Sequence, residues 1–139
     1  MEISIITAQD YSVVYTILTQ VAHSGIRIED DDPAGFERFI RRNPNCSFIA
    51  RVEDRIVGIL IAGHDGRRGH IYHTAILDPN RSRTIGKALL DALYAAFAED
   101  SIRKAGVLVD ADNDAGHDFF TAHGFYQRDD LDYFDHVAE

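Results

Sequence analysis

The chain has 139 residues, 45% of them apolar, and its 23 acidic against 14 basic side chains give a formal net charge of −9. This length supports one buried core, so we expect a single domain over residues 1–139. The acidic balance argues against a nucleic-acid partner, because phosphate-backbone binding depends on clustered Lys and Arg. No stretch approaches the roughly 18 consecutive apolar residues of a membrane span, and we expect no leader segment, no membrane partner and a cytoplasmic location. Acids gather at Glu29–Asp32, where they either attract an amine or form a solvated loop ending in a helix cap.

The N-terminal part predicts a strand followed by two helices. Residues 3–6 are rich in Ile and predict a short opening strand. Asp10 is a suitable N-cap for a helix whose apolar residues recur at helical spacing: Tyr11, Val14, Tyr15, Leu18, Val21 and Ala22. Asp32 and Pro33 supply a cap and a first-turn proline for a second helix that stops near Asn43.

The middle of the chain predicts three antiparallel strands. Two apolar runs, Ser47–Val52 and Ile56–Ala62, flank Glu53–Arg55 and predict a hairpin. The second run is apolar on both faces, so we expect a central strand covered by helices on both sides. Gly58 in this run leaves room for a close backbone approach or a bulge. After a polar turn, His70–Leu77 predicts the next strand.

The C-terminal part alternates helices and strands. An amphipathic helix with Leu89, Leu90, Leu93, Ala96 and Phe97 on its inner face precedes the short apolar run Val107–Val109. Strand, long helix and strand predict a parallel crossover. Asn113 can cap a last helix that ends at Gly124, before an aromatic run, Phe125–Phe134, that predicts a final strand. The predicted fold class is α/β, a mixed sheet in the order β-α-α-β-β-β-α-β-α-β.

The segment 81–90, RSRTIGKALL, places a basic loop of short side chains directly before the long helix. The first-turn N–H groups of a helix lack intrahelical acceptors and lie at the positive end of its dipole, which favours an anion by roughly 0.3–1 kcal/mol. Arg81, Arg83 and Lys87 add positive charge. The segment predicts a phosphate site, although an ordinary solvated helix start has the same composition.

This element order and two motifs resemble the GNAT superfamily of acetyl-CoA-dependent N-acetyltransferases, in particular its small stand-alone bacterial members. The superfamily's pyrophosphate loop is R/Q-x-x-G-x-G/A, and Arg81 and Gly86 match its first and last fixed positions. Its second motif, N-x-x-x-x-x-F-Y-x-x-x-G-F, is present as Asn113, Phe119-Phe120 and Gly124-Phe125. The resemblance covers nearly the whole chain.

The resemblance implies that acetyl-CoA lies in a notch where the fourth and fifth strands splay apart. Thr74, Ala75 and Ile76 would present backbone groups to its pantetheine arm, and the Ile76 N–H would polarise the thioester carbonyl. Asn113 and Phe120 would lie at the cofactor. A further set of residues would hold the pyrophosphate: Arg81, Ser82, Arg83, Thr84, Ile85, Gly86 and Lys87. The implied reaction is direct attack of a primary amine, from a small molecule or a peptide, on the acetyl group; a homodimer is left open.

Two departures from the superfamily pattern leave a second interpretation open. Thr84 replaces the first glycine of the loop, and a β-branched residue costs about 1–3 kcal/mol wherever φ must be positive. Phe120 stands where many members have a tyrosine that protonates the departing thiolate, and a phenyl ring has no proton to give. The alternative is a GNAT-fold module that binds acyl-CoA or a protein partner without turnover.

His70 and Tyr72 are the candidate catalytic residues. His70 lies six residues before Ile76, where histone-acetylating members of the superfamily place a glutamate, and its ordinary pKa of about 6.5 suits a general base. Tyr72 lies two residues further on, on the same face of the strand, and could act as acid, relay or substrate contact. The other interpretation is that both are ordinary surface residues of a strand.

The sequence predicts no metal site. The one cysteine, Cys46, begins an apolar run and is expected to be a buried or half-buried thiol without chemistry. The seven histidines show no ligand pattern, since His70 and His73 should face opposite sides of a strand. Residues 110–114 imitate the start of a calcium loop, but Ala115 and Thr121 stand where that loop needs glycine and glutamate.

Overall fold

The computed structural model describes residues 1–21, 23–26 and 30–138. They fall into two compact units, Met1–Leu108 and Val109–Glu139. Within the described ranges, no helix is both long enough and apolar enough to cross a membrane.

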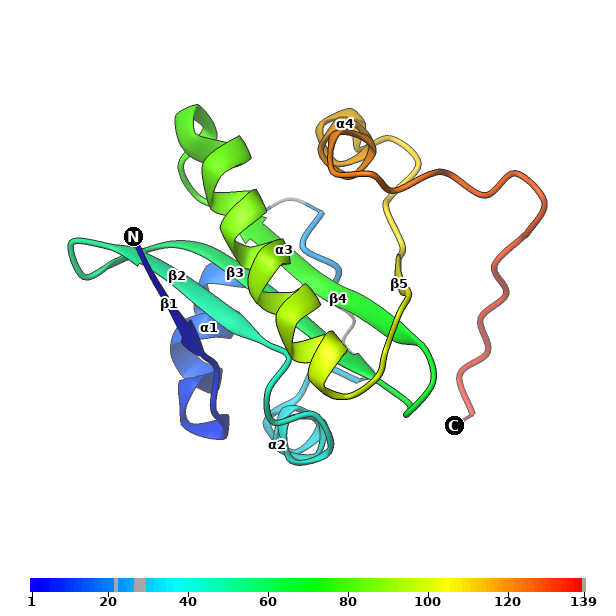
Figure 1. Cartoon of the computed structure of the whole chain (residues 1–139). Helices are drawn as coiled ribbons and strands as arrows, with labels where there is room; N and C mark the ends of the chain where they lie inside the picture. The colour runs from blue at the N-terminus through cyan, green and yellow to red at the C-terminus, as the bar shows by residue number, and fades with distance from the viewer. Residues whose placement is uncertain (22, 27–29, 139) are drawn as a thin grey trace. The chain divides into compact units, whose positions relative to one another are not determined.

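The first unit is built on a five-stranded sheet with the strands in chain order (Figure 1). The strands are β1 (Glu2–Ile5), β2 (Phe48–Val52), β3 (Arg55–His64), β4 (Gly69–Ile76) and β5 (Ala105–Val107). Neighbouring strands from β1 to β4 are antiparallel, whereas β4 and β5 are parallel. The helices are α1 (Tyr11–Leu18), α2 (Pro33–Arg42) and α3 (Ser82–Glu99), with short 3-10 turns at Ala8–Asp10 and Pro79–Arg81.

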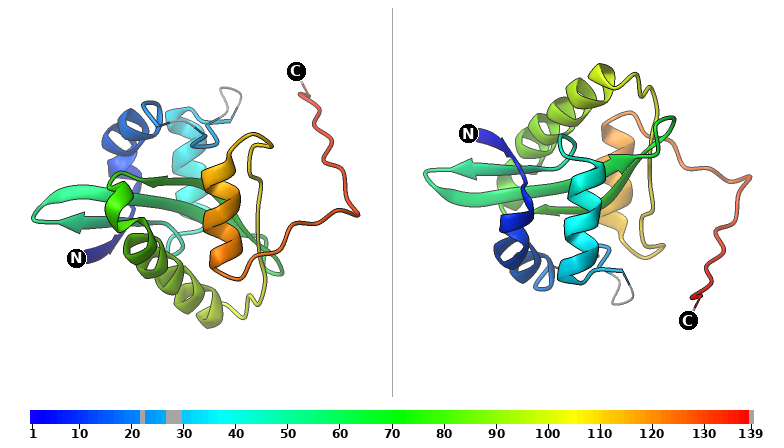
Figure 2. Two further views of the ribbon diagram at one scale, coloured as in Figure 1. Left: turned by 90° about the horizontal axis from the view of Figure 1, so that it is seen from above. Right: turned by 90° about the horizontal axis from the view of Figure 1, so that it is seen from below.

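Helices cover both faces of this sheet, as expected from the apolar third strand. Figure 2 shows α3 on one face and α1 and α2 on the other. The core on the α1 and α2 face consists of Ile6, Val14, Tyr15, Leu18, Phe36, Ile40, Ile49, Ile59, Ile61 and Ala75. On the opposite face, a Cβ added at Gly58 would lie 2.7 Å from Ile85 and 3.0 Å from Leu89, both of α3. The expected close approach at Gly58 is therefore confirmed, and a register shift lies beside it in the β2–β3 ladder.

Two local signals act as the sequence indicates, at α2 and at the β2–β3 turn. The Asp32 carboxylate accepts the Gly35 N–H at 2.7 Å, and Pro33 opens α2. Glu53 and Asp54 have φ of 51° and 66°, the two left-handed residues of a tight hairpin turn. The predicted Asp10 cap is wrong, because the Asp10 carboxylate accepts the Thr7 N–H at 2.8 Å and, among the described residues, makes no hydrogen bond to the first turn of α1. Helix α1 is shorter than predicted: it ends at Leu18, and position 22 lies outside the described residues.

The parallel crossover is confirmed, although β5 lies two residues earlier than predicted. Its ladder pairs Gly69 with Ala105 and Ile71 with Val107. The Gly69 N–H donates to the Lys104 carbonyl at 2.9 Å, which fixes this register at the start of the strand. The apolar pattern indicates burial, but backbone pairing decides which residues form the strand.

The second unit contains α4 (Asp114–Ala122) and a C-terminal segment. The Asn113 side-chain oxygen accepts the Gly116 N–H at 3.0 Å, so the predicted helix cap is confirmed. The predicted strand over Phe125–Phe134 is wrong, because the residues described up to 138 form no strand there. A strand needs a neighbouring strand that satisfies its backbone hydrogen bonds. Here the Arg128 guanidinium makes two local hydrogen bonds to the Asp130 carboxylate, each 2.8 Å long, and the side chains of Tyr126 and Phe134 stay exposed.

Candidate active site

The most distinctive feature of the first unit is the open edge of β4. Strand β5 pairs only with Gly69–Ile71, whereas β4 continues to Ile76. Among the described residues, Tyr72–Ile76 therefore has a strand neighbour on one side only, namely β3. This is the splayed arrangement of the fourth and fifth strands that the family resemblance implies, and it leaves unpaired backbone groups beside a short parallel strand.

The hydrogen-bond pattern decides which backbone groups face this open edge. The Leu77 N–H donates to the Val57 carbonyl at 2.8 Å, so the backbone N–H and C=O groups of Leu77 point toward β3. In an antiparallel ladder, the backbone groups of successive residues point alternately to the two sides of the strand. The N–H and C=O of Ala75 therefore also point toward β3, whereas those of Thr74 and Ile76 point to the open edge. Two of the three residues expected at the cofactor thus have free-edge backbone groups.

A β-bulge at Tyr72 changes which side chains of β4 share a face. Ile61 pairs with His73, but the next residue of β3, Ala62, pairs with Ile71, which leaves Tyr72 as an extra residue. The extra residue reverses the alternation of side chains along the strand. The prediction that His70 and His73 face opposite sides of the sheet is therefore wrong.

Contacts on both sides of the bulge confirm this. Gly63, the cross-strand neighbour of His70, abuts Asn43 and Phe39 of the α2 region. The His73 ring lies edge-on to Tyr15 of α1, with ring centroids 5.9 Å apart. Both histidines therefore face the α1 and α2 side.

His70 and Tyr72, the two predicted catalytic residues, do lie together. Their ring centroids are 4.6 Å apart, and the Phe39 ring packs edge-on to Tyr72 at 5.3 Å. Burial lowers the pKa of His70 below its ordinary value, which favours the neutral imidazole. Burial and the charge of Asp65 raise the pKa of Tyr72, so its phenol keeps its proton. The pair thus combines a proton acceptor and a proton donor next to the open edge.

A buried hydrogen-bonded cluster under the bulge was not predicted. His73 Nδ1 lies 3.0 Å from the Ser24 carbonyl oxygen, and Nε2 lies 3.1 Å from Asp31 Oδ1. The Tyr15 hydroxyl donates to the same carboxylate oxygen at 3.2 Å. A carbonyl only accepts, so Nδ1 carries a hydrogen, and a further proton lies between Nε2 and the carboxylate. The cluster connects the α1–α2 segment to β4. The side chains of His73 and Asp31 are both at least about nine-tenths buried.

The sequence pattern around Asp31 is misleading for this cluster. Asp31 lies within an acidic run that is typical of a solvated loop, and nothing in that run marks one carboxylate for burial. Burial and the Asp31 charge also raise the pKa of Tyr15. The buried phenol therefore stays protonated and remains a donor to Asp31.

Strand β4 leads directly into the predicted phosphate site. The Arg81 N–H donates to the Asp78 carbonyl at 3.0 Å, and the Ser82 N–H donates to Pro79 within the 3-10 turn. Helix α3 begins at Ser82, and in the part of the chain that the structure describes no side chain caps this end. The next two amides, those of Arg83 and Thr84, have no acceptor one turn earlier inside α3.

The segment expected to be a loop is therefore mostly helix. Thr84 lies in the first turn of α3 and is not among the residues with positive φ, so the strain considered for a β-branched residue does not arise. Ile85, Gly86 and Lys87 follow in the helix, where their amides have acceptors one turn earlier.

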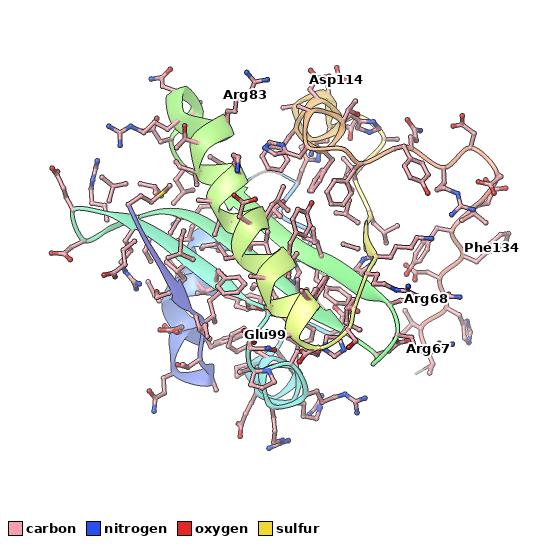
Figure 3. All side chains as sticks on the ribbon, viewed as in Figure 1. Arg67, Arg68, Arg83, Glu99, Asp114 and Phe134 are labelled. Carbon is pink, nitrogen blue, oxygen red and sulfur yellow. The ribbon has the colours of Figure 1, made fainter. Side chains whose placement is uncertain are left out.

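The three basic side chains of this end differ in how they are paired. Arg81 lies 3.8 Å from Asp78, and Lys87 forms a 2.7 Å ion pair with Asp91. Arg83 points away from the helix (Figure 3), and it has no salt-bridge partner among the described side chains. It is the cation at this end whose charge is not already matched.

Asn113 and Phe120 lie in the second unit. The Asn113 side-chain oxygen is occupied by the helix cap. The Phe120 ring packs edge-on to Phe119 and Phe125, with centroids 5.0 and 5.1 Å away. These contacts account for both residues as structural parts of α4.

A splayed mixed sheet whose open strand edge runs into a basic helix start is the architecture of a known class of acyl-group transferases, and comparison with known proteins identifies it. Residues 12–125 match the acetyltransferase (GNAT) family. The chain belongs to this family.

Individual relatives agree with the family match. An acetyltransferase of Pectobacterium atrosepticum is 30% identical over 115 residues, which is 83% of this chain and 80% of that protein. Ard1 from Thermoplasma volcanium has a similar fold, with a TM-score of 0.72, 22% identity, and coverage of 90% of this chain and 82% of that one. The aminoglycoside acetyltransferase AAC(6')-Iy, solved with a CoA-containing bisubstrate analogue, superposes with a TM-score of 0.75 at 16% identity, covering 99% and 98%.

Proposed function

We propose that this protein is an acetyl-CoA-dependent N-acetyltransferase that transfers the acetyl group to a primary amine by direct attack. One observation carries the proposal: the open edge of β4 runs straight into the uncapped, basic start of α3 in a chain of the acetyltransferase family. An extended amide chain can pair with such an edge, and a diphosphate can accept hydrogen bonds from such a helix start. CoA contains both groups in succession.

In this proposal, the free-edge groups of Thr74 and Ile76 bind the pantetheine arm, while Ala75 holds the strand to β3. The amides of Arg83 and Thr84 bind the pyrophosphate, with Arg83 supplying unpaired charge. Arg81 and Ser82 form the turn that leads into the helix. The other residues predicted to bind the pyrophosphate have amides that already donate within the helix: Ile85, Gly86 and Lys87. Asn113 and Phe120 remain predictions from the family motif.

Acetyl-CoA, when bound, supplies an activated thioester, and the chain's own groups manage protons and charge. His70, neutral because of its lowered pKa, accepts a proton from the ammonium of the acceptor. The Ile76 N–H, on the open edge, donates to the thioester carbonyl as charge develops there. Tyr72 keeps its proton and lies beside His70, so it can protonate the departing sulfur in place of the tyrosine that Phe120 replaces.

The acceptor is proposed only by class, as an amine of a small molecule or a peptide. Structures with the same fold include aminoglycoside acetyltransferases and a ribosomal-protein-alanine N-acetyltransferase from Brucella melitensis. We also propose that both units form one acetyltransferase domain, supported by a family match that spans them. The cytoplasmic location stays a prediction.

The experiment is an assay of free thiol released from acetyl-CoA against a panel of polyamines, aminoglycosides, amino acids and N-terminal peptides. We expect thiol release with at least one amine, and binding of acetyl-CoA by calorimetry without any amine. Binding without thiol release for any amine would favour the non-catalytic module that Phe120 leaves open. No binding at all would overturn both functions.

A further inference from the structure

Three side chains with metal-binding atoms meet at the C-terminal end of α3, opposite the end that carries Arg83 (Figure 3). Cys46 precedes β2, His64 is the last residue of β3, and Asp100 follows α3. Their ligand atoms all lie within 4.8 Å of one another. Cys46 is fully buried, whereas the side chains of His64 and Asp100 are 17% and 34% exposed and give access from solvent.

Hydrogen bonds already hold these groups in place. His64 Nε2 lies 2.9 Å from Asp100 Oδ2, and the Cys46 thiol donates to Asn45 Oδ1 at 3.2 Å. The Gly66 N–H donates to His64 Nδ1 at 3.0 Å, so that nitrogen carries no hydrogen. The ring proton therefore lies on Nε2 and is donated to Asp100.

This arrangement is not a nucleophilic cysteine site. Burial and the nearby Asp100 raise the pKa of Cys46 to about 11, which keeps the sulfur a thiol. Both imidazole nitrogens are engaged, Nε2 as a donor and Nδ1 as an acceptor from Gly66. Neither is available to take the proton of the thiol, so the pattern of Cys, His and Asp does not work as a catalytic triad.

The electrostatics of this helix end favour a cation. The C-terminal end of a helix carries partial negative charge, and basic residues there are the usual complement. Helix α3 has no basic residue in its last turn and ends instead with Glu99 followed by Asp100. Two carboxylates thus lie at the negative end of the dipole.

We propose that Cys46, His64 and Asp100 bind a zinc ion, with water in the fourth position. One thiolate, one imidazole and one carboxylate are the borderline-soft donors that zinc takes in tetrahedral sites, and the sulfur disfavours calcium and magnesium. The ion would join the start of β2, the end of β3 and the end of α3. The ion would lie at the C-terminal end of α3 and Arg83 lies at its N-terminal end, so the zinc takes no part in the acetyl transfer proposed above.

Binding must balance protons. The thiol releases one proton to solvent as the zinc–sulfur bond forms, and the Nε2 proton is replaced by zinc while Nδ1 takes up one. The Gly66 hydrogen bond then opens, and the turn has room for this because no described residue beyond its chain neighbours lies within 4 Å of where a side chain would begin at Gly66. One proton is released for each zinc bound, so affinity rises with pH.

The test uses the full chain, freed of metal by a chelator and titrated with Zn²⁺ and with Co²⁺ as a coloured substitute. We expect one equivalent of metal, a thiolate-to-cobalt charge-transfer band, release of about one proton and a higher melting temperature. Cys46→Ser should lose the band, and Asp100→Asn should weaken binding by about tenfold or more. His136→Gln, a histidine of the other unit, should leave all of these unchanged.

Two results would overturn the zinc site. One is binding without a thiolate band in the unaltered chain. The other is equal metal affinity in the unaltered chain and in Cys46→Ser, provided that both keep the same far-ultraviolet circular dichroism. Neither result depends on acetyl transfer, so this site and the proposed enzyme activity can fail separately.

Discussion

The two halves of β4 differ in how they are held. Gly69–Ile71 pairs with strands on both sides, whereas His73–Ile76 pairs with β3 alone among the residues that the structure describes. In the closed half, backbone hydrogen bonds satisfy both edges. In the open half, the backbone groups of Thr74 and Ile76 stay available, and these are the groups proposed to bind the cofactor. The fold thus leaves this edge unpaired because β5 ends early.

Side chains stabilise the open half where a neighbouring strand does not. His73, directly after the bulge, is tied to Asp31 and to the Ser24 carbonyl of the α1–α2 connection. Tyr15 joins the same carboxylate from α1. An edge that must stay unpaired is fixed from its buried face, so the open edge can be rigid without being closed.

The largest expected effect comes from removing Asp31. Asp31→Ala leaves two buried groups, His73 Nε2 and the Tyr15 hydroxyl, without their carboxylate partner, at a cost of about 1–3 kcal/mol of unfolding free energy for each unsatisfied group. Urea denaturation measures it. The matched control is Asp91→Ala, which removes the exposed ion pair with Lys87 and should cost about 1 kcal/mol or less. Equal losses in the two variants would show that the open half is not held by this pair.

Two proline substitutions test which backbone N–H groups of β4 point toward β3 and which point to the open edge. Ala75→Pro removes an N–H directed at β3 and should destabilise the fold by about 3 kcal/mol. Ile76→Pro removes an N–H directed at the open edge, so it should keep most of the stability and lose acetyl transfer. Ile76→Val keeps the amide and controls for side-chain packing. If Ile76→Pro unfolds the protein as readily as Ala75→Pro, the assignment of the open edge is wrong.

The next effect is catalytic and depends on pH. Because burial lowers the pKa of His70, the acid limb of kcat/KM should lie below about pH 6.5. His70→Gln should reduce kcat/KM by roughly 10²-fold and remove that limb. His117→Gln, in the second unit, serves as the control. A pH profile that is the same in His70→Gln and the unaltered enzyme would exclude His70 as the base.

The same lowered pKa makes a prediction about stability. A histidine that is harder to protonate when folded contributes stability that is present above its unfolded pKa, near 6.5, and lost as the pH falls below it. His70→Gln should therefore lose less stability than the unaltered chain between pH 7 and pH 5. Denaturation midpoints at the two pH values give the comparison.

The smallest expected effect is on CoA affinity, from substitutions at the start of α3, which follows the open half of β4. Arg83→Ala should weaken CoA binding by about 0.3–1 kcal/mol, roughly two- to fivefold, and more at low salt than at high salt. Lys87→Ala should have a smaller effect, because Lys87 is already paired with Asp91. Calorimetric titration with CoA at two ionic strengths measures both. A larger loss in Lys87→Ala would contradict this order.

Much of the architecture could be predicted from local signals. Asp32-Pro33 and Asn113 act over three or four residues, so their caps appear in the sequence as they do in the structure. The apolar run of β3 indicates a strand buried on both faces, because burial follows composition directly. The final strand over Phe125–Phe134 was predicted wrongly, because aromatic content does not supply the partner ladder that a strand needs.

The candidate site was predictable only as far as its motifs reach. The basic start of α3 follows from the composition of one segment. The resemblance to the family points to His70, and strand alternation then adds Tyr72. The partner of His73 could not be predicted, because Asp31 lies 42 residues away within an acidic run. The bulge at Tyr72 depends on how β3 and β4 pair, and neither strand shows it alone.

By itself, the sequence determined the family, the order of elements up to and including the last helix, and the position of the basic helix start. These depend on periodicity, caps and short motifs, which are properties of neighbouring residues. Only the tertiary structure decided where β5 stops, which amides of β4 stay free, and that Cys46, His64 and Asp100 meet. Those features depend on strand register and on contacts between distant segments, which the packing of the whole unit sets.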